Sequence, residues 1–112
     1  MSEKRKYSRI NVKGKIDGRV VLASQIVIID LSLGGVHFTC TKRVMINSIC
    51  TINLKHKDKA IGVKGKVVRS IFVGTKKIKT ARVPVYEIAM EFPDLPENKL
   101  DILKKIMESI DT

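Results

Sequence analysis

The chain has 112 residues, enough for one domain with a modest core, and 44% of them are apolar, which excludes wholesale disorder. Its 22 lysines and arginines against 11 acids give a net charge of +11, so we expect an anionic partner such as nucleic acid, a nucleotide, an acidic protein or anionic lipid. The longest apolar runs, at 20–23 and 26–29, are too short for a membrane span, and the charged first residues predict no signal peptide.

The first half of the chain is predicted to form strands. Residues 10–16 alternate between apolar and polar, which indicates a half-buried strand, and Asp17-Gly18 signals a turn. Residues 20–29 are almost continuously apolar and β-branched, which predicts a strand covered on both faces. A turn at Gly34-Gly35 then leads into a further alternating strand at 36–40.

Strand patterns continue through the middle of the chain. Residues 46–54 form another strand, followed by a polar turn at 56–59. Apolar residues from 61 to 73 share one face of a long strand, where Gly65 suggests a bend or bulge. The basic segment 74–79 is predicted to be a loop.

The C-terminal part changes its period. Residues 86–92 alternate as a strand, whereas the apolar residues from Leu100 to Ile110 recur at helical spacing behind Pro96, which predicts a helix over 95–110. About six antiparallel strands followed by one amphipathic helix favour a small closed or partly closed β-barrel, with the helix covering an end or a side.

Catalytic and metal-binding patterns are scarce. His37 and His56 have no Cys, Asp or Glu at metal-ligand spacing, apart from Asp58 beside His56, and are interpreted as structural or solvated. There is no nucleophile elbow, phosphate-binding glycine loop or acid/base pair, so we expect no enzyme, no metal and no cofactor. Cys40 and Cys50 are too few for a disulfide framework and predict core positions in a reducing cytoplasm.

Two arginines stand out in the basic segment before the first strand. Arg5 and Arg9 are four residues apart, and in an extended chain they would share a face at a spacing of about 13 Å. Two guanidinium groups so placed can each bind a phosphate or the O6/N7 edge of a guanine, or stack on a base. The alternative is a solvated basic tail.

A second pattern, Asp-Leu-Ser-Leu-Gly-Gly at 30–35, follows the apolar run. The Asp30 carboxylate can accept from N1–H and N2–H₂ of guanine, Ser32 can donate or accept nearby, and glycine allows backbone to approach a ligand. The alternative is an ordinary turn, in which Asp30 and Ser32 bond to local backbone.

Together, Arg-x-x-x-Arg and the later Asp-x-Ser-x-x-Gly resemble the two-part signature of the PilZ domain family. The resemblance covers essentially the whole chain, including Gly-Lys-Val-Val-Arg at 65–69, Met-Glu-Phe at 90–92 and the closing helix. It implies a six-stranded antiparallel β-barrel with a C-terminal helix that binds the bacterial second messenger cyclic di-GMP. The site residues that the resemblance implies are Arg5, Arg9, Asp30, Ser32 and Gly35.

The sequence departs from the family pattern at Lys4, where many relatives have a further arginine. Lysine keeps the charge but lacks the planar fork, so binding of one or two ligand molecules stays open. Ala89 stands where glycine is frequent, and only a local packing change is expected. Arg69 shares the predicted apolar face, unless it reaches the barrel mouth or a bulge re-aims it. It is either a snorkelling side chain or, like Lys4 and Gly34, an additional candidate for ligand contact.

The expected function is therefore a bacterial receptor or adaptor within a single domain over 1–112. A mobile arm (1–9) would close on the barrel (10–92) when cyclic di-GMP binds, and the signal would pass to a downstream effector protein of unknown identity. One alternative is a nucleic-acid-binding barrel, which the charge favours and the scarcity of aromatic residues opposes. Another is a module of the same fold that serves protein interaction without binding cyclic di-GMP.

Overall fold

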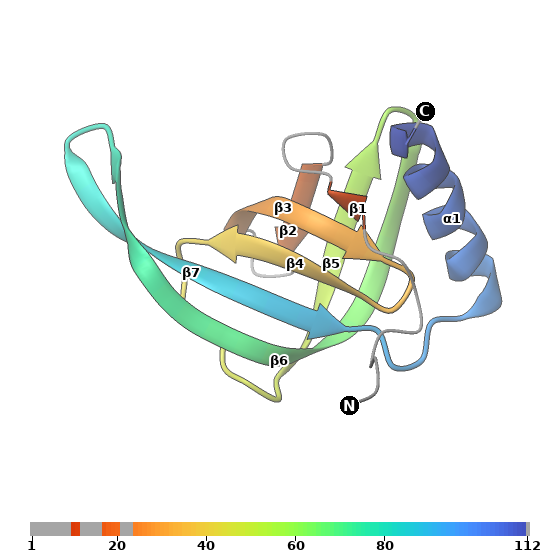
Figure 1. Ribbon diagram of the computed structural model, residues 1–112, viewed down its shortest axis with the longest axis horizontal. Coiled ribbons are helices and arrows are strands. Elements are labelled where there is room, and N and C mark those ends of the chain that lie inside the picture. The colour runs from red at the N-terminus through yellow and green to blue at the C-terminus, as the bar shows by residue number, and fades with distance from the viewer. Residues whose placement is uncertain (1–9, 12–16, 21–23, 112) are drawn as a thin grey trace.

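The computed structural model describes residues 10–11, 17–20 and 24–111. Within these ranges the chain forms one strongly curled antiparallel sheet followed by a single helix (Figure 1). The strands are β1 (Ile10–Asn11), β2 (Asp17–Val20), β3 (Ser24–Ser32), β4 (Gly35–Cys40), β5 (Ile49–His56), β6 (Lys59–Ile78) and β7 (Ala81–Glu91), and the helix is α1 (Glu97–Asp111). The prediction of a predominantly β, antiparallel fold with a late helix is confirmed.

The strand order in the sheet is β1-β3-β2-β5-β6-β7-β4, and the curl brings β4 back to pair with β3. The described residues hold seven strands, so the predicted number of six is not confirmed as such. The additional strand arises because the segment predicted as one strand at 20–29 contributes to both β2 and β3. β1 corresponds to the start of the strand predicted at 10–16 and pairs with the end of β3 through Ile10 opposite Leu31 and Asn11 opposite Asp30. The remaining residues of the strand predicted at 10–16 lie outside the described ranges.

Three predictions for the early strands are wrong. Asp17 and Gly18 begin β2 instead of forming a turn, because β2 is hydrogen-bonded on both sides, with Asp17 opposite Val27 of β3 and Lys55 of β5. The predicted strand at 20–29 is divided, because β2 ends at Val20 and β3 begins at Ser24, which pairs antiparallel with Val20. Nor is β3 covered on both faces: Val27 is 38% exposed.

The middle strands follow the sequence pattern more closely. β5 starts at Ile49, and Ile46 precedes the strand as an exposed residue, so the start predicted at 46 is too early. The polar turn predicted between β5 and β6 is confirmed at residues 57–58, where Lys57 adopts a positive φ of 56°. β6 buries Ile61 and Val63 as predicted.

The basic loop predicted at 74–79 is absent from the structure. β6 continues to Ile78, residues 79–80 form the turn, and β7 begins at Ala81, so the two strands make a long hairpin. The hairpin projects from the rest of the sheet (Figure 1). The register shifts twice along it, and Ile71 and Val73 are 40% and 52% exposed, so they do not share the buried face as predicted.

The core lies inside the curl of the sheet. The alternation predicted for β4 and β7 is confirmed by the burial of Val36, Phe38 and Cys40 and of Ile88, Met90 and Phe92. Cys40 and the half-buried Cys50 are both free thiols, and burial raises the pKa of the Cys40 thiol.

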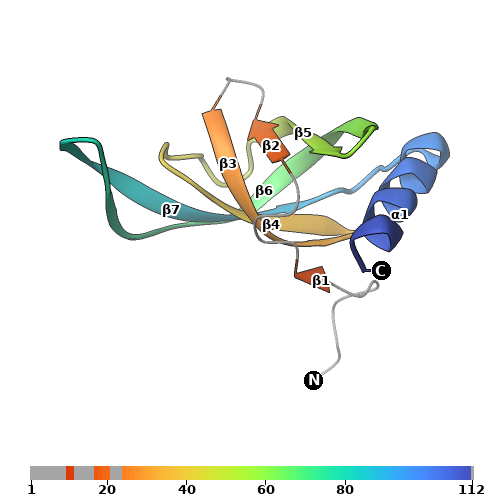
Figure 2. The same ribbon diagram turned by 90° about the horizontal axis from the view of Figure 1, so that it is seen from above.

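The helix α1 closes one end of the molecule, opposite the projecting hairpin (Figure 2). Its apolar stripe buries Leu103 and Ile106 completely, as the helical spacing predicts, and Lys99 Nζ donates to the carbonyl oxygen of Gly62 on β6 at 2.6 Å. With 15 residues, several of them charged, α1 is too short and too polar to cross a bilayer, and the described residues contain no other helix.

Candidate functional site

A β-bulge sets the direction of Asp30. Ile28 pairs with Phe38 and Asp30 pairs with His37, so Ile29 is the extra residue in β3. Because of this bulge, Ile28 and Leu31 both lie in the core although they are three residues apart. Asp30 consequently lies on the outer face of the sheet, with its side chain 22% exposed.

The turn after β3 is organised by Ser32, which is only 4% exposed. Its Oγ accepts from the N–H of Gly34 at 3.1 Å and donates to the carbonyl of Gly35 at 3.4 Å. The carbonyl of Gly34 accepts from the N–H of Phe92 at 2.9 Å, which ties the turn to the end of β7. The alternative interpretation, in which the serine bonds to local backbone, therefore describes Ser32 in this structure.

Gly35 has a reason within the fold to be glycine. It lies opposite Glu91 in the β4–β7 ladder, and a Cβ added to it would collide with the carbonyl oxygen of Met90. From the sequence, a glycine here is expected to let backbone approach a ligand closely. The structure shows that neighbouring backbone already makes such an approach.

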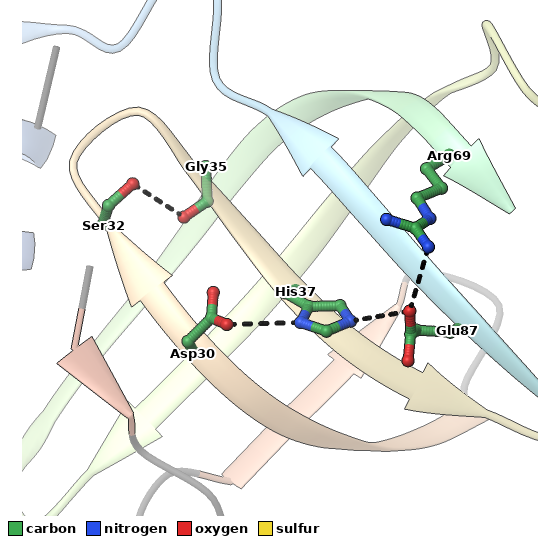
Figure 3. A network of polar contacts seen from close by, with 6 residues as sticks. All are labelled: Asp30, Ser32, Gly35, His37, Arg69 and Glu87. Atoms are coloured by element: carbon green, nitrogen blue, oxygen red, sulfur yellow. Dashed lines mark hydrogen bonds and ion pairs between the residues drawn. The ribbon is translucent and has the colours of Figure 1, made fainter. Parts of the chain in front are cut away.

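A transverse row of outward-facing residues crosses four strands at the level of Asp30. Asp30 of β3 lies opposite His37 of β4, His37 opposite Ala89 of β7, and Ala89 opposite Arg69 of β6. His37 Nδ1 is 3.2 Å from Asp30 Oδ2, and the two side chains are each 22% exposed (Figure 3). Both groups are thus partly shielded from water while remaining accessible at the surface.

Glu87, two residues before Ala89 on β7, links the other half of the row. Its Oε1 is 3.4 Å from His37 Nε2 and 3.7 Å from Arg69 Nη2 (Figure 3). The register shift between Val67 and Arg69 turns Arg69 outward to 58% exposure, so its predicted place on the apolar face is wrong and the alternative, a bulge that re-aims it, is confirmed. Asp30, His37, Glu87 and Arg69 therefore form one chain of polar contacts.

His37 is the residue that sequence reasoning misses. One of its partners, Glu87, comes from β7, far away in the sequence, and no spacing reveals that contact. A signal was nevertheless present, because a two-residue turn at 33–34 pairs position 30 with position 37. In the part of the chain with described coordinates, no group of three His, Cys, Asp or Glu side chains is arranged to hold a metal ion.

The predicted arm residues Lys4, Arg5 and Arg9 lie outside the described ranges. What the structure does give is the place where that segment joins the sheet. Ile10 and Asn11 pair with Leu31 and Asp30, directly beside the Asp-x-Ser-x-x-Gly turn.

Comparison with known proteins gives one family match: the profile of the PilZ domain matches residues 3–109. Among solved structures, the PilZ domain with c-di-GMP of YcgR from Escherichia coli superimposes with a TM-score of 0.72 at 14% identity, covering 97% of this chain and 92% of that one. No curated protein sequence matches.

Two longer solved proteins contain the same fold. YcgR from Escherichia coli in complex with c-di-GMP gives a TM-score of 0.67 at 16% identity, with 97% of this chain and 46% of that chain covered. MrkH, described as a c-di-GMP-dependent transcription regulatory factor, gives 0.70 at 16% identity, with 96% and 51% covered. This chain spans about half the length of either protein, and at these identities the likeness concerns the fold.

Proposed function

Since this chain belongs to the PilZ domain family, we propose that it is a receptor for cyclic di-GMP that acts through a protein partner and not as an enzyme. The supporting observation is the outward-facing Asp30 next to the point where the N-terminal segment enters the sheet. We interpret the succession β3-β2-β5-β6-β7-β4 as the six-stranded barrel of the family, with β1 as an added strand. The solved YcgR structures contain c-di-GMP, which supports this ligand.

Asp30 is the proposed guanine-reading group. Its carboxylate accepts hydrogen bonds, and guanine presents the N1–H and N2–H₂ donors on one edge, which adenine lacks in this arrangement. Ser32 supports the site mainly by fixing the turn, and its hydroxyl keeps one lone pair beyond the two local bonds. Gly34 and Gly35 have no side chains, so they would let the bound ligand approach the backbone closely.

Arg5 and Arg9 are the proposed phosphate and base contacts from the N-terminal arm. Arg9 directly precedes Ile10 in the sequence, and Ile10 pairs with Leu31, the residue after Asp30. A guanidinium can take a phosphate oxygen and a guanine edge in the same plane. Lys4 and Arg69 are proposed as additional contacts.

Binding is proposed to close residues 1–9 over the outer face of the sheet. Cyclic di-GMP carries two phosphodiester charges, which would offset the positive charge of the arm and of the strands. The surface that results would then be recognised by the downstream protein. In this proposal the chain is a single cytoplasmic domain, and the conformational change is its output.

Isothermal titration with cyclic di-GMP tests the proposal. Removing one charge-assisted contact costs about 1.5–3 kcal/mol, so Arg5→Ala and Arg9→Ala should each weaken binding at least about tenfold. Lys104→Ala removes the same charge from the exposed side of α1 and should leave affinity unchanged. Absence of binding by the parent protein, or parent-like affinity in both arginine variants, would contradict the proposal.

A further inference from the structure

The Asp30 carboxylate needs support if it is to recognise a guanine edge. A single methylene group connects this carboxylate to the backbone on the outer face of the sheet. If the side chain rotated freely, its two oxygens would rarely be aligned with the N1–H and N2–H₂ donors of guanine. The structure provides a partner for one of these oxygens directly across the β3–β4 pair. That partner is His37, whose Nδ1 lies 3.2 Å from Asp30 Oδ2.

The chemistry of the pair assigns the donor. An ionised carboxylate only accepts, so the hydrogen bond has Nδ1–H of His37 donating to Asp30. A carboxylate has about four lone-pair positions, so it can accept from more than one donor at the same time, such as His37 and a guanine edge. Protonated His37 would donate from both nitrogens, to Asp30 and to Glu87.

Glu87 lies on the opposite side of the imidazole ring. Its Oε1 lies 3.4 Å from His37 Nε2, and Arg69 in turn lies 3.7 Å from the same oxygen. Ala89 occupies the row between His37 and Arg69, so no large side chain displaces the ring from that direction. The imidazole ring thus lies between the carboxylates of Asp30 on β3 and Glu87 on β7, the two strands that flank β4 (Figure 3).

We propose that His37 is a positioning residue of the cyclic di-GMP site, which orients the Asp30 carboxylate for guanine. The inference rests on the proposed function, since it concerns recognition by Asp30. In this proposal His37 helps the site to distinguish guanine from adenine. It does so by orienting Asp30 and not by contacting the ligand.

Two near-isosteric substitutions separate the two sides of the ring. His37→Asn places an amide N–H₂ near the position of Nδ1 and retains the bond to Asp30, whereas His37→Gln reaches the position of Nε2 and retains only the contact with Glu87. By isothermal titration with cyclic di-GMP, His37→Asn should bind within about threefold of the parent. His37→Gln and His37→Ala should bind about tenfold more weakly.

A double-mutant cycle with Asp30→Asn distinguishes positioning from a general structural role. If His37 acts through Asp30, His37→Gln causes no further loss in the Asp30→Asn background. The inference about His37 would be overturned if His37→Gln weakened binding equally in the parent and in the Asp30→Asn background. It would also be overturned if His37→Asn and His37→Gln bound with equal affinity. In either case, binding by the parent protein would still support the receptor function. A parent protein that does not bind cyclic di-GMP would refute both. Thermal unfolding of each variant verifies that it is folded.

Discussion

Gly35 shows how one residue can satisfy a recognition motif and the fold together. Every other residue type would direct its Cβ at the Met90 carbonyl, which is backbone and is fixed in the β4–β7 ladder. Gly35→Ala must therefore shift one strand against the other. We expect it to lower the free energy of unfolding by about 1–3 kcal/mol, the usual cost of overpacking, measured by urea denaturation.

Gly62 provides the matched control for that substitution. A Cβ at this position would meet the Asn53 Oδ1, which belongs to an exposed side chain able to rotate away. Gly62→Ala should therefore leave the free energy of unfolding within about 0.5 kcal/mol of the parent or raise it. Equal losses at both glycines would show that the close approach to Met90 is not the cause.

The β6–β7 hairpin has two parts: the part near the body of the molecule belongs to the curled sheet, whereas the projecting end contributes little to the core. Phe72 and Tyr86 lie opposite each other where the hairpin leaves the body of the sheet, with ring centroids 5.8 Å apart at 67°. Phe72 remains 57% exposed. From this pair outward, the hydrogen-bond ladder and cross-strand contacts such as Arg82 to Thr75 hold the hairpin together.

A phenylalanine-to-alanine substitution, made once in the core and once in the hairpin, tests whether the projecting end contributes less to stability. Phe38 on β4 is fully buried, so Phe38→Ala should lower the free energy of unfolding by about 3–5 kcal/mol through lost transfer energy and a cavity. Phe72→Ala should cost less than about 1.5 kcal/mol, the value of its edge-to-face contact. Urea denaturation of both variants measures the difference. A comparable cost at Phe72 would mean that the hairpin is packed as firmly as the core.

The elements that could be predicted from sequence are those with one buried and one exposed face. The alternation of residues 86–92 and the helical spacing from Leu100 to Ile110 indicate which side chains are buried, and therefore which element forms. The strand at Asp17-Gly18 could not be predicted, because pairing with β3 and β5 overrides a local turn preference. The bulge that turns Asp30 outward leaves no mark in the apolar run, and His37 acquires its partners only through strand register.

For the whole molecule, the distribution of charge sets the conditions for ligand binding. Eight lysines and arginines and no acid occur from Lys59 to Tyr86, and the arm adds Lys4, Arg5, Lys6 and Arg9. Closing the positively charged arm over the positively charged strands brings like charges together. This is unfavourable unless an anion lies between them. In the proposed mechanism the ligand therefore both occupies the site and removes the repulsion that opposes closure.

This mechanism predicts that cyclic di-GMP protects the arm from trypsin, which cleaves after lysine and arginine. Cleavage after Lys4, Arg5, Lys6 and Arg9, followed by intact-mass spectrometry, should slow at least about fivefold at saturating ligand, because the closed arm is held at both phosphates. Asp30→Asn keeps every cleavage site but weakens the hold on guanine, so at the same ligand concentration it should show less protection. Raising the salt concentration should screen the attraction and shift protection to higher ligand concentrations. An arm cleaved equally fast with and without saturating ligand would show that binding occurs without closure, and the output would then have to come from the sheet alone.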